Sequence, residues 1–265
     1  MQQMTFMECV KRAWASAWEA LTRMPALVLG TFVAYAALGW LGLAGRPIPG
    51  EGEAPSAGLV LAANLASLLN ALVYVWFMLK VYRFVLLGER ATPLMASGAK
   101  PFARIVGLGF VMMLALLGIA AAFWLVLRPQ HEGGVAFLSL IVGAIWVFVG
   151  VRLSLLYPSL AIGGRFALGA AWRDSRGHFW SVLGVSCVAA LPLLACGVVA
   201  LIGLGIAGVT PESVQTPAWV TVLAIGQSAV NVVFALLTSA ALAWLYRRYA
   251  NELAGTGGAG AASVR

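Results

Sequence analysis

The sequence has little charge. Only 10% of its 265 residues are Asp, Glu, Lys or Arg, whereas roughly a quarter of the residues in an ordinary soluble domain are charged. Hydrophobic residues make up 62% of the chain, and several apolar runs reach the ~20 residues that a helix needs to cross a bilayer. The composition therefore excludes an ordinary soluble domain. It predicts an all-α polytopic membrane protein, with connections too short for a separate soluble domain.

Residues that bind metals or perform catalysis are also scarce. The three cysteines have no C-x-x-C spacing, and the two histidines do not lie at the spacing of metal ligands. We find no nucleophile beside a base and no paired carboxylates, and the G-x-G-x-x-G spacing at residues 203–208 ends an apolar run instead of following a strand. We therefore expect a non-enzymatic protein without a metal or a cofactor.

Six membrane spans and two flanking segments are predicted. Residues 1–23 form an interfacial amphipathic helix, because Thr5 and Glu8 fit a capping box and Trp14 and Trp18 suit the membrane surface. Residues 250–265 have too little apolar content to become ordered. The membrane domain, residues 24–249, contains spans at about 24–44, 59–79, 102–127, 135–157, 180–207 and 218–246.

The distribution of basic residues predicts the orientation of these spans. With a cytoplasmic N-terminus, fifteen of the seventeen Lys and Arg residues lie on the cytoplasmic side, and only Arg46 and Arg128 lie opposite. Such a bias is typical of the positive-inside rule, so both termini are expected in the cytoplasm. The basic residues are spread between apolar spans and form no single patch, so a nucleic acid is not the expected partner despite the formal charge of +8.

A weak internal repeat runs through the chain. The segments MPALVLG, PFARIVG and HFWSVLG end at Gly30, Gly107 and Gly184, each 77 residues after the one before. Each of the three precedes an out-and-back pair of apolar runs and follows a basic surface segment. The pattern predicts three related helical hairpins.

Arg152 stands out because it is a charged residue inside an apolar run. A charge at the centre of a membrane helix costs ~2.5 to 3.5 kcal/mol on insertion scales, so it usually has a partner or a purpose. Arg152 lies seventeen residues after Val135, which allows its side chain to reach the headgroups. The alternatives are an ion pair with Asp174 or Glu19, or a bound lipid phosphate beside a cytoplasmic cavity. Pro158 is expected to bend or end this helix.

A basic aromatic segment follows Arg152. Cationic side chains are phosphate ligands, and aromatic rings suit the headgroup level. The candidate headgroup-binding residues are Arg152, Arg165, Trp172, Arg173 and Arg176. Ordinary anchoring of the protein at the membrane surface would use the same residues.

Four amide side chains fall within the predicted spans. They are Asn64 and Asn70 in the second span and Gln227 and Asn231 in the sixth. Because water is absent from the bilayer core, such amides need partners. Hydrogen bonds between helices and a polar transport path both satisfy this need.

The layout and three motifs resemble a known family. The entry segment KRAWASAW, the motif RLSLLYPSLAIGG after the fourth span and the segment AWRDSRGHFW resemble YciC-like bacterial inner-membrane proteins and the related membrane domain of glycerophosphoryl diester phosphodiesterases. The resemblance implies a multi-pass protein of the bacterial cytoplasmic membrane. The chain carries no appended phosphodiesterase domain, so that activity is not implied.

We therefore expect a membrane module that binds or organises anionic lipid, or a partner membrane protein or a second copy of itself, through its basic aromatic residues. The alternative is a small-solute or lipid transporter that uses the polar faces of spans two and six.

Overall fold

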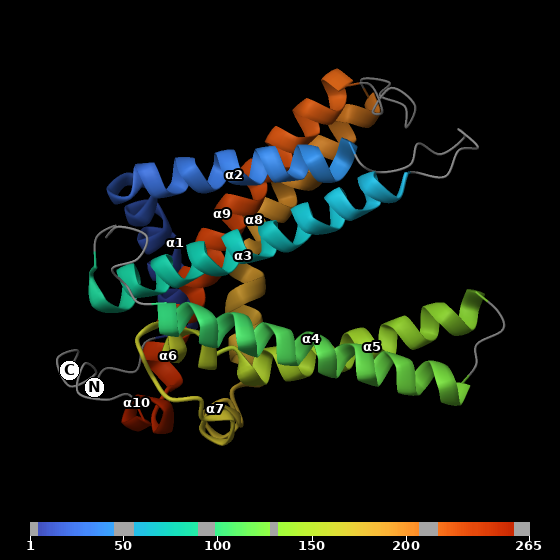
Figure 1. Ribbon diagram of the computed structural model, residues 1–265. Helices are drawn as coiled ribbons and strands as arrows, with labels where there is room; N and C mark the ends of the chain where they lie inside the picture. The colour runs from blue at the N-terminus through green and yellow to red at the C-terminus, as the bar shows by residue number, and fades with distance from the viewer. Residues whose placement is uncertain (1–4, 45–55, 90–98, 128–131, 207–216, 257–265) are drawn as a thin grey trace. The chain divides into compact units, whose positions relative to one another are not determined.

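The computed structural model describes residues 5–44, 56–89, 99–127, 132–206 and 217–256 (Figure 1). Within these ranges every regular element is a helix. The helices are α1 (Phe6–Arg23), α2 (Pro25–Ala44), α3 (Ala57–Leu87), α4 (Ala99–Leu127), α5 (Glu132–Leu153), α6 (Leu156–Ala161), α7 (Leu168–Asp174), α8 (Phe179–Ile206), α9 (Pro217–Tyr249) and α10 (Glu252–Thr256). Six of the helices in the described ranges, α2, α3, α4, α5, α8 and α9, are long and apolar enough to cross a membrane. The predicted all-α, six-span membrane fold is confirmed.

The long helices begin at regular intervals. The first helix of each predicted hairpin begins at Pro25, Ala99 or Phe179, which gives intervals of 74 and 80 residues against the 77 of the sequence repeat. The basic segment before the second hairpin falls largely on residues 90–98, outside the described residues. Arg46 and Arg128, the two basic residues expected on the far side of the membrane, also lie outside them.

The chain folds into two compact units, which we describe separately. Unit 2 consists of residues 5–91 and 185–241, so it holds α1, α2, α3 and most of α8 and α9. Unit 1 consists of residues 1–4, 92–184 and 242–265, and its described elements are α4 to α7, α10 and the adjoining ends of α8 and α9.

Helix α1 of unit 2 begins as the sequence predicts. The hydroxyl of Thr5 accepts a hydrogen bond from the backbone N–H of Glu8 at 3.4 Å, which satisfies one of the unpaired donors at the helix start. Glu8 pairs with Arg12, and Glu19 pairs with Arg23. Only one residue, Met24, separates α1 from the apolar helix α2.

Helix α1 has three faces instead of two. The buried face consists mostly of small residues, with Cys9, Ala13 and Ala20 fully buried, and α1 packs on α2 and α3. The exposed apolar residues form a separate stripe at Met7, Trp14, Trp18 and Leu21, which share one side of a helix with 3.6 residues per turn. Charged residues occupy the third face. The small apolar residues of α1 therefore pack against protein, and the stripe that contains Trp14 and Trp18 remains exposed.

Helix α3 is longer than the sequence predicted. It continues to Leu87, eight residues beyond the expected end of the second span, and Gly88 ends it in the left-handed conformation with φ +70°. Lys80 and Tyr82, which follow the predicted end of the second span, are buried. Arg83 makes two hydrogen bonds of 2.8 and 2.7 Å to the carboxylate of Glu89.

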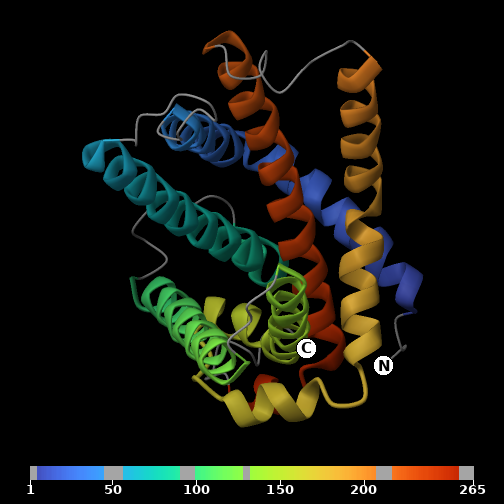
Figure 2. The same cartoon turned by 90° about the vertical axis from the view of Figure 1, so that its right-hand side faces the viewer.

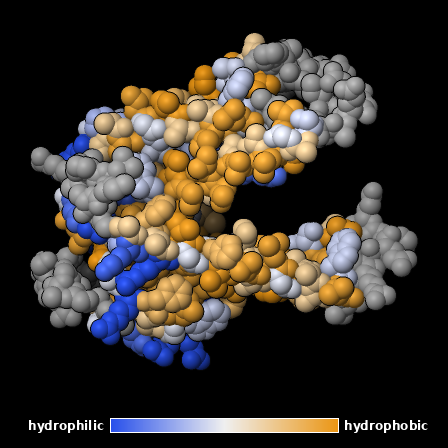
Figure 3. Space-filling view, in the orientation of Figure 1, coloured by the Kyte–Doolittle hydropathy of each residue, from blue (hydrophilic) through white to orange (hydrophobic). Residues whose placement is uncertain are grey.

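Unit 1 is built on the α4–α5 hairpin, which extends as two adjacent helices in Figures 1 and 2. The helix ends remote from the 128–131 connection form what we call the hairpin base. Short helices α6, α7 and α10 gather there, since α6 packs on α4, α7 packs on α5, and α10 packs on both α7 and α6. Apolar side chains cover α4 and α5, and hydrophilic side chains gather around α7 and α10 (Figure 3).

The segment after α5 differs from the expectation. Helix α5 ends at Leu153, five residues before Pro158, and the chain turns at residues 154–155 before α6 begins. The fourth span was expected to continue to about residue 157. Instead Leu155, Leu156 and Leu160 are fully buried. The motif RLSLLYPSLAIGG therefore forms part of the protein core.

Candidate functional site

Helix α5 places Arg152 near the expected depth of the lipid headgroups. Its apolar part runs from Gly134 to Leu153. Arg152 follows Gly134 by eighteen residues, about 27 Å at 1.5 Å per residue, and a hydrocarbon core is ~30 Å thick. Arg152 therefore lies at one edge of the apolar layer that α5 can span, at the hairpin base.

The Arg152 guanidinium lies over two neighbouring aromatic rings. Its central carbon is 5.3 Å from the ring centre of Phe148 and 5.3 Å from that of Trp172, within the range of a cation–π interaction. Phe148 in turn contacts Trp172 at 5.8 Å and Phe179 at 5.5 Å. The aromatic cluster holds the cation in place without neutralising its charge.

Two donor atoms of Arg152 lack a hydrogen-bond partner in the part of the chain that the structure describes. Nε and Nη1 are buried and make no hydrogen bond, and no ion pair to Arg152 forms among the residues that the structure describes. Guanidinium has five N–H donors and no acceptor. A cation in this state at the membrane edge attracts an anion.

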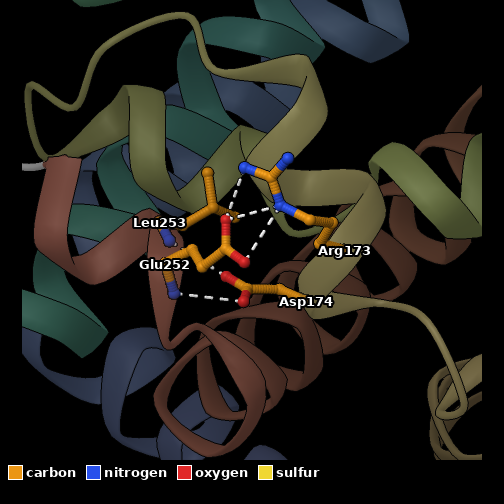
Figure 4. Close-up of polar contacts among 4 residues, drawn as sticks. All are labelled: Arg173, Asp174, Glu252 and Leu253. Atoms are coloured by element: carbon orange, nitrogen blue, oxygen red, sulfur yellow. Dashed lines mark hydrogen bonds and ion pairs between the residues drawn. The ribbon is translucent and has the colours of Figure 1, made fainter.

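The hypothesised Arg152–Asp174 pair is not formed. The carboxylate of Asp174 accepts hydrogen bonds from the backbone N–H groups of Glu252 and Leu253, at 3.1 and 2.9 Å (Figure 4). It therefore caps the first turn of α10 and is only 8% exposed. Glu19, the other candidate partner, pairs with Arg23 at 3.0 Å.

Arg173 also has a carboxylate partner that the sequence did not reveal. Its Nε lies 3.0 and 2.7 Å from the two carboxylate oxygens of Glu252, and its Nη2 lies 2.6 Å from Oε2 (Figure 4). This hydrogen-bonded carboxylate raises the pKa of Arg173 above its ordinary value. Arg173 was predicted to bind a headgroup, but in the structure its guanidinium is occupied by an internal anion.

The C-terminal segment is ordered where it meets α7. Residues from 250 onward were expected to be disordered, but residues 252–256 form α10. Leu253 is fully buried, and Tyr249 stacks on His178 with ring centres 4.3 Å apart. Burial of Leu253 and the cap from Asp174 explain the order, which local composition does not show. Residues 257–265 lie outside the described part of the chain.

Arg165 and Arg176 are also exposed, as Arg173 is. Neither makes an ion pair within the part of the chain that the structure describes. Exposed apolar side chains accompany them, namely Phe166, Leu168, Trp172 and Trp180. The surface around α7 therefore combines cations with aromatic rings, as expected of an element at headgroup level.

We call Arg152, Arg165, Trp172, Arg173 and Arg176 the basic aromatic belt. Sequence reasoning missed two residues that define its chemistry, Phe148 and Glu252. Phe148 precedes Arg152 by four residues in a helix, so its contact with Arg152 was predictable from spacing. Glu252 is 79 residues from Arg173 and gave no such signal. Another arginine, Arg104, donates to the carbonyl oxygen of Gly164 at 3.1 Å and supports the turn after α6.

The four amides belong to unit 2. Gln227 donates to Asn231 at 3.1 Å within α9, so this pair satisfies itself along one helix instead of joining two helices as expected. Asn64 is exposed on α3. Asn70 is partly buried, and its buried Oδ1 has no hydrogen-bond partner. The structure does not show these amides linking α3 to α9.

Among the described residues, no three His, Cys, Asp or Glu side chains are placed to hold a metal ion. Comparisons with protein-family models, curated proteins and solved structures find no match to this chain. The resemblance to YciC-like proteins remains a prediction from the motifs.

Proposed function

We propose that this integral membrane protein is a non-catalytic module that binds anionic phospholipid at its basic aromatic belt. The observation that carries the proposal is the Arg152 guanidinium, which is held over the rings of Phe148 and Trp172 and whose buried Nε and Nη1 donors lack an acceptor among the described residues. A phosphate oxygen is a strong acceptor for guanidinium.

The surroundings of Arg152 support a lipid ligand. The exposed cations Arg165 and Arg176 flank the same short helix, α7, and juxtamembrane Lys or Arg residues contribute about 1 kcal/mol each toward anionic lipid. We further propose that the belt faces the cytoplasm, with both termini on that side, in a bacterial inner membrane. The basis is the excess of basic residues on one side of the predicted spans.

Native mass spectrometry of the purified protein tests the proposal. The probes are phosphatidylglycerol and phosphatidylcholine supplied in equal amounts to the wild type, to Arg152→Gln and to the double variant Arg165→Gln/Arg176→Gln. We expect the wild type to retain phosphatidylglycerol preferentially, and each lost charge to reduce retention about fivefold.

The matched control is Arg12→Gln, which removes the same charge from the charged face of α1. Its retention of phosphatidylglycerol should equal that of the wild type. Equal retention by the wild type, Arg152→Gln and the double variant would overturn the proposal. A protein partner or a second copy at the belt would appear in the same spectra as added protein mass.

The alternative function is transport of a lipid or small solute along the polar residues of α3 and α9. One observation favours it: the Oδ1 atom of Asn70 is buried within a predicted span without a hydrogen-bond partner, at a cost that a polar substrate would relieve. In proteoliposomes, a transporter would move fluorescent phosphatidylglycerol between leaflets, and Asn70→Leu would slow that movement. Equal rates with Asn70→Leu and with the wild type argue against this role for Asn70.

A further inference from the structure

Two sets of contacts join α7 to α10, the Arg173–Glu252 ion pair and the contacts of Asp174 and Leu253. They respond differently to a competing anion. The ion pair itself is exposed, with 65% and 45% of the two side chains accessible to solvent. Exposed ion pairs contribute little to stability and are screened by salt. A second anion can therefore replace Glu252 at Arg173 without a large change elsewhere.

The rest of the α7–α10 contact does not depend on that pair. Asp174 holds the backbone N–H groups of Glu252 and Leu253, and the side chain of Leu253 is fully buried. Release of the Glu252 carboxylate from Arg173 consequently leaves α10 docked. Only the carboxylate needs to move for Arg173 to bind a different anion.

From this arrangement we infer that Glu252 is an internal competitor for the lipid headgroup at Arg173, which makes the belt selective for headgroups of higher negative charge. The inference rests on the proposed lipid binding. Glu252 occupies Nε and Nη2 of the guanidinium, two of the donors that would form a forked contact with phosphate.

The competition favours one chemical class of lipid. A phosphodiester headgroup carries a single negative charge, as the Glu252 carboxylate does, and gains little by exchange. A phosphomonoester carries about −1.5 to −2 charges at neutral pH and presents three acceptor oxygens. Phosphatidate should therefore displace Glu252 more readily than phosphatidylglycerol.

A double-mutant cycle on the full chain tests this competition. The variants are Glu252→Gln, Arg173→Gln and the double variant, each with phosphatidate, phosphatidylglycerol or phosphatidylcholine as the probe in native mass spectrometry. We expect Glu252→Gln to raise phosphatidylglycerol retention about fivefold, because one arginine is released to bind lipid. The ratio of phosphatidate to phosphatidylglycerol retained should therefore fall.

Arg173→Gln alone should lower phosphatidate retention about fivefold, because it removes the arginine that phosphatidate takes from Glu252. In the double variant, the rise in phosphatidylglycerol retention that Glu252→Gln causes should disappear. A gain that persists in the double variant would assign the effect to net charge and overturn the inference. Hydrogen exchange at the Leu253 amide should stay slow in Glu252→Gln, and fast exchange there would overturn the claim that α10 remains docked.

Failure of the inference is distinguishable from failure of the proposed function. If Arg152→Gln lowers phosphatidylglycerol retention but Glu252→Gln leaves it at the wild-type level, lipid binding stands and the competition is wrong. If the wild type and every variant retain anionic lipids and phosphatidylcholine equally, both the competition and the proposed binding of anionic lipid are wrong.

Discussion

At the scale of single residues, the arginines of the belt differ in what holds them. Arg152 is held by aromatic rings and keeps its donors unpaired, whereas Arg173 is held by a carboxylate. Arg165 and Arg176 project from the surface. The sequences around the four arginines of the belt look alike. Among them only Arg152 is partly buried and has buried donor atoms without a hydrogen-bond partner.

Asp174 should stabilise α10, because its carboxylate caps the first turn of that helix. Replacement by Ala removes the acceptor for two backbone N–H groups, and loss of a helix cap typically costs about 0.5–2 kcal/mol. We expect the amide hydrogens of Glu252 and Leu253 to exchange about tenfold faster in Asp174→Ala, the equivalent of 1.4 kcal/mol. Hydrogen exchange followed by mass spectrometry measures this.

Asp174→Asn serves as the matched variant, because it keeps one side-chain oxygen as an acceptor but loses the charge. Its exchange rates should lie between those of the wild type and Asp174→Ala. Unchanged protection in Asp174→Ala would mean that Leu253 alone docks α10.

Gly164 should tolerate no side chain. A Cβ at this position would lie 2.7 Å from the backbone oxygen of Ser159 and closer still to its hydroxyl. Overpacking of this kind costs about 1–3 kcal/mol, so Gly164→Ala should lower the thermal unfolding temperature measured by circular dichroism in detergent.

Gly169→Ala is the control for this substitution. Its Cβ would meet only Nη1 of Arg173, at an ordinary contact distance of 3.8 Å. Because Gly169 lies within α7, alanine should be neutral or stabilise the helix by up to about 1 kcal/mol. Similar unfolding temperatures for Gly164→Ala and the wild type would show that the turn after α6 can move.

Residue roles in the belt were only partly readable from the sequence. The residue types and their clustering identified the correct segment, because cations and aromatic rings near a span have few other uses. The partners were not readable, since Arg173 and Glu252 are 79 positions apart. Asp174 was predicted as a partner of Arg152 because the two are close in sequence. In the structure its carboxylate instead accepts hydrogen bonds from the backbone N–H groups at the start of α10.

At the scale of elements, α1 shows what an amphipathic pattern leaves undecided. The apolar period was correctly read as a helix, but the pattern does not say whether lipid or protein covers the apolar side. Small residues at Cys9, Ala13 and Ala20 allow close packing of a helix. Large residues such as Trp14 and Trp18 do not, and they remain exposed.

The buried face of α1 should be intolerant of added volume. Ala13 is fully buried, so Ala13→Leu should destabilise the protein by about 1–3 kcal/mol. Ala15 is exposed on the charged side of the same helix, and Ala15→Leu adds the same volume with an expected effect within about 0.5 kcal/mol. Unfolding in mixed micelles compares the two, and equal stabilities would contradict the packing of this face.

At the scale of the whole molecule, the six spans follow from composition and the shorter elements do not. A run of about twenty apolar residues forms a helix in a bilayer because every backbone polar group must be satisfied internally, so α2, α4 and α8 begin within a few residues of their predicted starts. Helices α6 and α10 have six and five residues. Their existence depends on buried leucines and on contacts distant in sequence.

The number of spans decides whether the two ends of the membrane domain lie on the same side of the membrane. Six spans return the chain to the side on which it began, so the segment before α2 and the segment after α9 lie on the same side. The basic residues predict which side that is, because loops rich in Lys and Arg stay in the cytoplasm. The same rule predicts that the hairpin base and both termini face the cytoplasm.

Cysteine labelling in spheroplasts tests this orientation directly. Single cysteines at positions 5, 128 and 255 are introduced into a variant in which Cys9, Cys187 and Cys196 are replaced by Ala. A membrane-impermeant maleimide should label position 128 in intact spheroplasts, and positions 5 and 255 only after lysis. The inverse pattern would reverse the orientation and expose the belt to the periplasm. Labelling of positions 5 and 255 from different sides would contradict an even number of spans, because only an odd number separates the two ends.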